Sequence, residues 1–179
     1  MWLSAFSRSN PDTTVSVLTD NQAKLVQAVA DGELDCAFVN TAFSHPRLVS
    51  AYSFPEKLAF VAPHSIDPGQ LSRQTLIATN IPGCPYRRLL EDWSIRTSSC
   101  PPKVIEFDTL EGILKAVSLG MGISLLPTSV LEGVQDLQFF PSTEMGETHI
   151  HLVVPKGMGN EALPPFIQAV TAHTDRPKE

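Results

Sequence analysis

One cysteine lies where a thiol could react. Cys84 stands in the run Gly83-Cys84-Pro85, directly before a helix that is predicted to begin near Pro85. A thiol at the amino end of a helix can ionise more readily, which would suit an oxidant sensor or a nucleophile. A nucleophile also needs a base, and no histidine lies near Cys84 in the sequence. A redox sensor stays an alternative, packing in the wall of a site is the simpler interpretation, and no enzyme is expected.

Two histidines form a second candidate, on one face of a predicted strand. His149 and His151 are two residues apart, and Glu147 would share their face, as metal ligands could. Two imidazoles make an incomplete site, and a solvated strand face explains the pair more simply. The sequence also has no phosphate loop and no GxGxxG motif, because Gly120-Met121-Gly122 lacks a third glycine. We therefore expect neither a metal nor a cofactor.

The remaining candidates are small and polar residues near the ends of predicted strands. In parallel α/β sheets, ligands bind beyond the carboxyl ends of the strands, where helix amino ends offer N–H groups. This rule selects Asn21, Asn40, Thr41, Thr79, Asn80, Gly83, Cys84, Phe107, Asp108, Thr109, Gly122, Ile123 and Pro127. Any one of them could simply form a turn or a cap. As a group they predict a small-molecule site, with a carboxylate held by the Thr79 hydroxyl and by the helix that starts near Cys84.

The last of these residues lie in a predicted strand–helix–strand unit, Val104–Pro127. Its first strand is the β-rich run 104–107, and Asp108 then stands where a helix N-cap belongs, with Glu111 at the capping-box spacing. Apolar residues recur at i, i+3, i+4 and i+7, as on one face of a helix, and Gly120 suits the turn after it. The run up to Pro127 is short and apolar, like a buried strand. This unit predicts a parallel sheet nearby.

The same order of elements recurs near the amino terminus. Thr13–Leu18 is strand-like, Asp20 or Asn21 caps a helix that Gly32 ends, and Leu34–Val39 is a second short strand. Further strands are predicted over 48–54, 57–61, 75–78, 137–140 and 149–154, and further helices from 85 onward and over 164–172. This pattern favours two α/β lobes joined by crossing strands.

The helix predicted from Pro85 has one apolar and one solvated face. Arg87, Arg88 and Glu91 fall on the solvated face. Arg88 and Glu91 are three residues apart, so they are expected to form a weak ion pair.

Composition limits the classes of protein that fit. The 179 residues are 42% hydrophobic and 18% charged, which is ordinary for a soluble globular protein. The net charge of −6 argues against DNA binding by this segment, which normally needs a basic face. No apolar run approaches the roughly 18 residues of a membrane span, and the first ten residues lack the apolar core of a signal peptide. Three widely spaced cysteines suit a reducing compartment, so we expect a cytoplasmic protein without a membrane partner.

Four motifs occur in an order that resembles a known family. They are DGELDCAF at 31–38, LAFVAP at 58–63, GCPYR at 83–87 and GMGISLLP at 120–127. Together they resemble the effector-binding domain of LysR-type transcriptional regulators, over about Ser4 to His173. The resemblance implies a periplasmic-binding-protein-like fold, in which two α/β lobes enclose a cleft for a small-molecule effector.

The resemblance also implies how the chain is divided. Lobe one would comprise residues 1–60 and 150–179, and lobe two residues 61–149. Crossover strands near Lys57–Pro63 and His149–Pro155 would form the hinge. The sequence departs from the family pattern because it matches neither the N-terminal winged helix-turn-helix nor the first strand of lobe one. We therefore expect a fragment of a longer regulator, with one wall of the cleft missing.

The function that this resemblance implies is effector sensing combined with oligomerisation. Binding of a small, carboxylate-bearing ligand between the lobes would shift a conformational equilibrium in a homodimer or homotetramer. DNA would be contacted only through the absent N-terminal domain. Helices such as the one predicted over 110–117 would build the subunit contact. The alternatives are a solute-binding protein of the same fold and a redox sensor that acts through Cys84.

Overall fold

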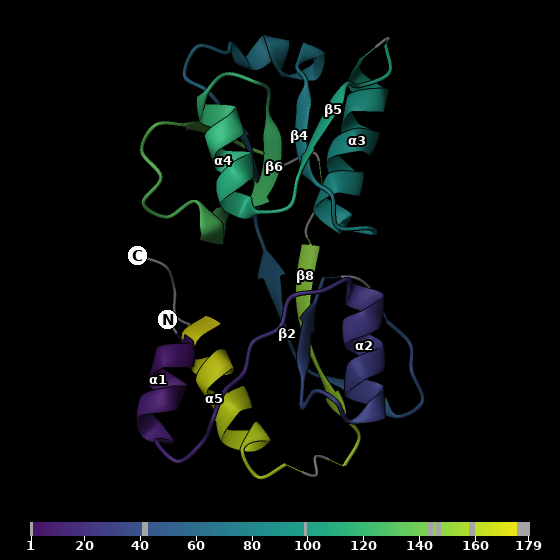
Figure 1. Ribbon diagram of the computed structural model, residues 1–179, viewed down its shortest axis with the longest axis vertical. Helices are drawn as coiled ribbons and strands as arrows, with labels where there is room; N and C mark the ends of the chain where they lie inside the picture. Colours follow the sequence, from purple (N-terminus) through teal and green to yellow (C-terminus); the bar gives the residue numbers. More distant parts are fainter. Residues whose placement is uncertain are drawn as a thin grey trace. The chain divides into compact units, whose positions relative to one another are not determined.

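The computed structural model describes residues 2–40, 43–98, 100–142, 145, 148–157 and 160–174. The chain forms two compact units (Figure 1). Unit 1 comprises Met1–Phe54 and His149–Glu179, and unit 2 comprises Pro55–Thr148. The chain therefore passes from one unit to the other twice, between Phe54 and Pro55 and between Thr148 and His149.

Unit 1 is a small sheet with helices on both faces. Its strands are β1 (Ala37–Val39), β2 (Leu48–Glu56) and β8 (Thr148–Pro155), in the order β1-β8-β2, and its helices are α1 (Trp2–Ser9), α2 (Gln22–Asp31) and α5 (Leu163–Thr174). Neighbouring residues of a strand point to opposite faces of the sheet. Val153 accordingly packs with Val29 of α2, whereas Val154 packs with Val170 of α5. Figure 1 shows α2 on one side of this sheet and α1 with α5 on the other.

Unit 2 is built around β3, whose five residues are all buried. Its strands are β3 (Leu58–Ala62), β4 (Leu76–Thr79), β5 (Val104–Phe107), β6 (Ser124–Pro127) and β7 (Gln138–Pro141). The helices are α3 (Pro85–Thr97) and α4 (Leu110–Ser118), with short 3-10 turns η1 (Pro68–Arg73) and η2 (Thr128–Val130). Strand β3 lies between β6 and β7 and is antiparallel to both. Strands β4 and β5 are parallel, and a parallel bridge between Leu76 and Ile123 joins the two sheets.

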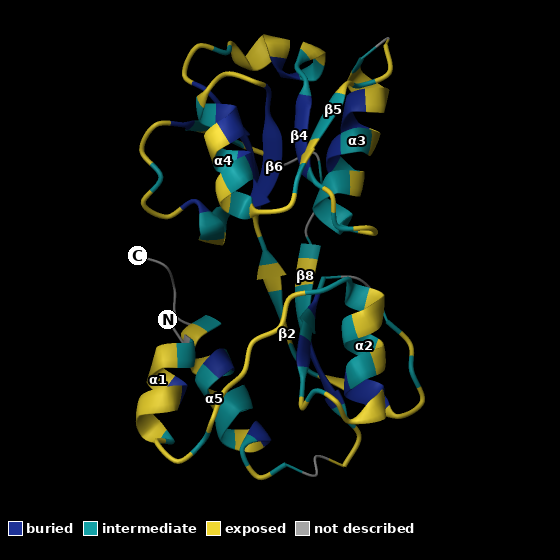
Figure 2. Ribbon diagram, viewed as in Figure 1, coloured by how far each residue is buried: buried dark blue, intermediate teal, exposed yellow. Residues whose placement is uncertain are grey.

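The two helices of unit 2 cover opposite faces. Helix α3 packs Leu90 and Trp93 against Leu76, and α4 packs Ile113 and Val117 against Ile77. Because Leu76 and Ile77 are consecutive in β4, their side chains point to opposite faces of the sheet. Figure 2 shows β4 and β6 buried, while the outer faces of α3 and α4 carry exposed residues. This arrangement confirms the strand–helix–strand unit and the parallel pairing that were predicted around Val104–Pro127.

The prediction of a strand over Thr13–Leu18 is wrong. The segment has no regular secondary structure and forms no ladder with the described residues, and Val17 and Leu18 are 75% and 59% exposed. Alternation of apolar residues indicates which side chains would share a face, but it does not supply a hydrogen-bonding partner. The first strand–helix–strand unit therefore lacks its first strand.

Two further sequence predictions need correction. The N-cap of α4 is Thr109, whose hydroxyl accepts the Gly112 N–H at 3.1 Å, so the prediction of Asp108 as the cap is wrong by one residue. The crossing strand expected near Lys57–Pro63 is also displaced, because β3 lies wholly within unit 2 and β2 is the strand that passes the boundary. Strand β2 runs through Pro55 because an edge strand can hold a residue without an N–H group.

Candidate functional site

The carboxyl ends of β4 and β5 bring most of the predicted residues of unit 2 together. Thr79 pairs with Phe107 in the parallel register, and the Asn80 N–H donates to the Phe107 carbonyl at 2.9 Å. Asp108 and Thr109 follow Phe107 directly and are exposed. The Thr79 hydroxyl accepts the Ile81 N–H at 3.2 Å, so its own proton remains able to bind another acceptor. Donors from two strand ends thus lie at one edge of the sheet.

Helix α3 begins beside this edge without a side-chain cap. Cys84 is its N-cap residue and is half-buried, yet its side chain makes no capping hydrogen bond. Gly83 has a φ of 74°, in the left-handed region that favours glycine, and turns the chain into the helix. Pro85 occupies the first helical turn, where the lack of an N–H costs nothing. The Cys84 side chain therefore does not compete with a ligand for the first-turn N–H groups of α3.

Arg87 fastens the first turn of α3 to both strand ends. Its Nε lies 2.8 Å from Glu91 Oε1, its Nη1 lies 2.6 Å from Glu106 Oε1, and Nη1 also donates to the Thr79 carbonyl at 3.1 Å. The hydrogen bonds that Arg87 donates to Glu91 and Glu106 raise the pKa of its guanidinium group. The predicted Arg88–Glu91 pair is wrong, because Glu91 pairs with Arg87, and Arg88 lies 3.8 Å from Asp92. Sequence spacing could not show the contact with Glu106, which depends on the packing of α3 over β5.

Three of the predicted residues belong to the scaffold of unit 2. Ile123 is fully buried beside Leu76, and Gly122 lies against the Thr75 carbonyl. Both stand at the amino end of β6, the opposite end of the parallel strands from Thr79. Pro127 ends β6, where it is buried opposite Leu58. The structure therefore does not group Gly122 and Ile123 with the polar residues.

The predicted residues of unit 1 lie around the start of α2. Asn21 is the N-cap, and its side chain accepts the Ala23 N–H at 2.8 Å. Asn40 is held by Gln22, whose Oε1 accepts the Asn40 N–H at 2.9 Å and whose Nε2 donates to the Asn40 side chain. Gln22 was missed from the sequence because glutamine at a second helical position carries no distinctive signal. Thr41 lies outside the described residues.

Glu56, the last residue of β2, was also missed. The Tyr86 hydroxyl of α3 donates to the Glu56 carboxylate, and the Thr148 hydroxyl donates to the Glu56 carbonyl at 3.1 Å. Glu56 is half-buried, and this burial raises the pKa of its carboxyl group above the ordinary value, although the bond from Tyr86 opposes the shift. All three residues belong to unit 2.

The raised pKa predicts a pH dependence of stability. Between the ordinary carboxyl pKa of 4.5 and the higher folded value, the folded state binds more protons than the unfolded state, so stability falls as pH rises through this window. Glu56→Gln keeps an oxygen for Tyr86 and removes the charge. In thermal unfolding, the Tm of the variant minus the Tm of the original protein should increase from pH 4 to pH 8. An equal difference at both pH values would contradict the prediction.

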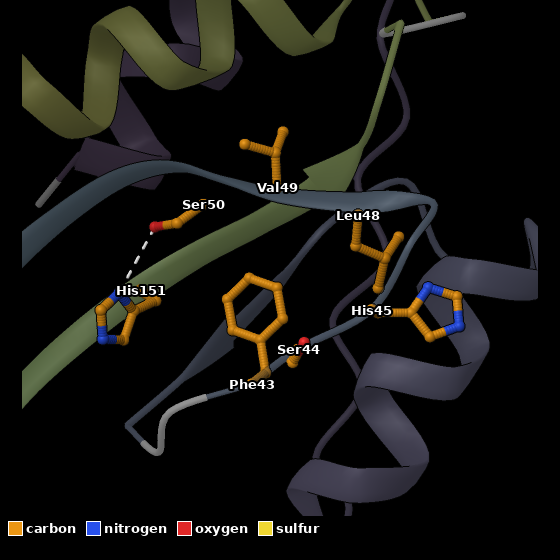
Figure 3. A pocket seen from close by; sticks show the side chains of 7 residues that line it. All are labelled: Phe43, Ser44, His45, Leu48, Val49, Ser50 and His151. Carbon is orange, nitrogen blue, oxygen red and sulfur yellow. Dashed lines mark hydrogen bonds between the residues drawn. The ribbon is translucent and has the colours of Figure 1, made fainter.

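Unit 1 contains a separate cavity of about 440 Å³, lined by Phe43, Ser44, His45, Leu48, Val49, Ser50 and His151 (Figure 3). His151 Nδ1 lies 3.4 Å from Ser50 Oγ, which donates to the Tyr52 carbonyl at 3.1 Å. In this arrangement the serine proton is donated to the Tyr52 carbonyl and not to His151. This arrangement leaves the serine hydroxyl without a base, so it does not form a nucleophilic pair.

The histidines do not assemble a metal site in the described part of the chain. His151 contacts Phe43 edge-on and Ser50, whereas His149 is exposed. The searched residues contain no group of three or more His, Cys, Asp or Glu that could hold a metal. Glu147 lies outside the described residues. No helix of the described chain is long and apolar enough to span a bilayer.

The model of the LysR substrate binding domain matches residues 1–175. The chain belongs to this family. This LysR-type chain is 28% identical over 173 residues to the HTH-type transcriptional regulator SoxR of Arthrobacter sp. (strain TE1826), which covers 94% of the chain and 60% of the relative. It is 33% identical over 130 residues to the uncharacterized HTH-type regulator YusT of Bacillus subtilis (strain 168), covering 73% of the chain and 44% of the relative. The chain thus spans about half the length of these relatives.

Solved structures show the same fold as this LysR-type chain. A full-length BenM E226K mutant matches with a TM-score of 0.77 at 17% identity, covering 99% of the chain and 65% of that structure. The BenM effector-binding domain with its effector benzoate matches with a TM-score of 0.74 at 16% identity, covering 99% and 87%. These similarities confirm the predicted periplasmic-binding-protein-like α/β fold, and the family model over residues 1–175 confirms the predicted family.

Proposed function

We propose that this chain is the sensing part of a longer LysR-type transcriptional regulator and that its effector is a small monocarboxylate. The observation that carries the proposal is the uncapped amino end of α3, which lies beside the strand ends of Thr79 and Phe107. Helix amino ends attract anions because their N–H groups point outward and the helix dipole is positive there. The relative that was solved with benzoate carries a ligand of this kind.

Several donors must act together to hold such a ligand. An anion at a helix amino end gains about 0.3–1 kcal/mol at an exposed site and up to about 2 kcal/mol when partly buried. Micromolar binding requires about 8 kcal/mol in total. The hydroxyl protons of Thr79 and Thr109 and the side-chain amide of Asn80 are the further donors at this edge. Burial of an apolar part of the ligand would supply the remainder.

The charges of unit 2 favour one carboxylate over two. The Arg87 guanidinium is bound to Glu91 and Glu106, so it is not available as an ion partner. Asp108 adds a negative charge at the same edge. A second ligand carboxylate would therefore meet an acidic group without gaining a cation from these residues. Monocarboxylates are expected to bind more tightly than dicarboxylates of similar size.

Membership of the family supports the remaining partners that we propose. In the full-length protein, effector binding would shift the equilibrium between two forms of a homodimer or homotetramer. DNA would be contacted by a domain outside residues 1–179. Leu119 and Met121, which follow α4, are 66% and 42% exposed and support a subunit contact at that end of the helix. Light scattering at high protein concentration should show a dimer or tetramer, and a strict monomer would count against this part of the proposal.

A thermal-shift panel tests the ligand class. A ligand that binds only the folded state raises Tm, by an amount equivalent to about 2.7 kcal/mol at a hundredfold excess over Kd. Benzoate, salicylate and 3-phenylpropionate should raise Tm, and succinate at equal ionic strength should raise it less. The Cys84→Ala variant should keep this response, because it removes the thiol without adding a cap. Absence of any shift at millimolar concentration, or complete loss of the response in Cys84→Ala, would overturn the proposal.

A further inference from the structure

Glu56 is the point in unit 2 where three elements meet. It ends β2, its carboxylate accepts the Tyr86 hydroxyl from the first turn of α3, and its carbonyl accepts the Thr148 hydroxyl at the start of β8. Pro55 and Thr148 are the residues of unit 2 at the two places where the chain passes between the units. Glu56 thus links the helix of the candidate ligand site to both passages.

The hydrogen bond that the structure gives to the Glu56 carboxylate comes from a neutral group. Tyr86 faces it from α3, and Thr148 contacts its backbone from β8. Lys57 follows Glu56 in the chain and His149 follows Thr148, and both are exposed. Among the described residues no Lys, Arg or His forms an ion pair with Glu56. A half-buried carboxylate without a cation loses hydration that one phenol restores only in part.

We propose that the Glu56–Tyr86 contact is a latch that ties the first turn of α3 to the two chain passages and opens when they move. Two opposing contributions hold this latch near balance. The hydrogen bond favours the closed form seen here, and the cost of keeping the carboxylate out of water favours an open form. A ligand at the amino end of α3 would act on the latch directly. The role of the latch in sensing therefore rests on the proposed function. Glu56 would thus position the first turn of α3 without contacting the ligand.

The latch predicts opposite effects for two substitutions that preserve shape. Glu56→Gln keeps an acceptor for Tyr86 and removes the charge, so the closed form should gain. Tyr86→Phe keeps the ring and removes the donor, so the open form should gain. If the contact were only structural packing, both substitutions would loosen the region.

Hydrogen–deuterium exchange of the unliganded chain at pH 8 tests this proposal. Tyr86→Phe should speed exchange at least threefold over residues 85–90 and also over 55–58 and 148–152. Glu56→Gln should slow exchange in the same three segments. Arg88→Gln is the matched control on α3, because the Arg88 side chain is 86% exposed, and it should leave all three unchanged.

Two results would overturn the latch: faster exchange in both variants, or an effect of Tyr86→Phe that stays within α3. Should Tyr86→Phe not fold, Thr148→Val removes the hydroxyl bound to the Glu56 carbonyl and should speed exchange over 55–58 and 85–90. An effect confined to 148–152 would again contradict the proposal. The measurement uses no ligand, so its failure would leave the carboxylate site standing.

Discussion

Replacing Cys84 with aspartate is expected to stabilise the fold and to remove carboxylate binding. An aspartate at the N-cap would accept the Arg87 N–H at the third helical position and would place a negative charge at the positive end of α3. A good N-cap residue is worth about 0.5–2 kcal/mol over one that does not cap. The same side chain would occupy the donors assigned to the ligand and would repel its carboxylate. We expect the affinity for a monocarboxylate to fall at least tenfold.

Calorimetric titration and chemical unfolding together check this prediction. Cys84→Ala is the matched control, since it lacks both the thiol and a capping oxygen, and its affinity should stay within about threefold of the original protein. The expected signature is a gain in stability with a loss of binding in Cys84→Asp alone. If Cys84→Asp bound the monocarboxylate as tightly as Cys84→Ala, the ligand would not be at this helix end.

Gly122→Ala is expected to be the most damaging single substitution that adds one methyl group. A Cβ at this position would lie 2.1 Å from the Thr75 carbonyl oxygen and 2.9 Å from its carbon. The same carbonyl accepts the Ile123 N–H at 2.9 Å, so the backbone cannot move away without breaking the bridge between β4 and β6. Overpacking typically costs about 1–3 kcal/mol, and a clash with backbone belongs at or above the upper end. A loss of about 3 kcal/mol would lower Tm by roughly 10 °C.

Gly133→Ala provides the comparison for this prediction. Gly133 has a φ of 87° and no atom within 4 Å of an added Cβ, so only backbone strain opposes the methyl group. That strain costs about 1–2 kcal/mol. Thermal unfolding should therefore rank Gly122→Ala well below Gly133→Ala. Equal Tm values would show that the junction of β4 and β6 is less tightly packed than described.

Local signals in the sequence predicted the elements that position the site. The helix from Pro85 and the unit Val104–Pro127 are encoded by apolar spacing and turn residues that lie next to one another in the chain. The sequence could not decide the N-cap of α4, because aspartate and threonine are both good N-cap residues. In the structure it is the Thr109 hydroxyl that accepts the Gly112 N–H. The Thr13–Leu18 prediction failed for a different reason. A strand requires a partner, and alternation alone does not provide one.

Part of the candidate site also followed from the sequence. Because β4 and β5 are parallel, the residues after each strand must lie at the same edge, which places Thr79 and Asn80 beside Phe107. The same rule does not hold for Gly122 and Ile123, because these residues stand at the amino end of β6. The direction of the strand decides which of its residues reach the edge.

Contacts between distant residues could not be predicted in this way. Glu56 and Tyr86 meet only because α3 packs beside the end of β2, and the two residues are 30 positions apart in the sequence. Arg87 could equally have been a solvated helix residue, and Glu106 recruits it through the packing of α3 over β5. Both contacts arise from tertiary packing of side chains that a single sequence leaves unspecified.

The most direct test of the carboxylate site is an NMR titration of the ¹⁵N-labelled chain with the monocarboxylate that raises Tm most. We expect the backbone amides of Arg87, Thr79, Asn80 and Thr109 to shift together and to saturate at the Kd found by calorimetry. Cys84→Asp should abolish these shifts, and Cys84→Ala should retain them. Saturable shifts confined to other residues, with the Arg87 amide unmoved, would contradict a carboxylate site at the amino end of α3.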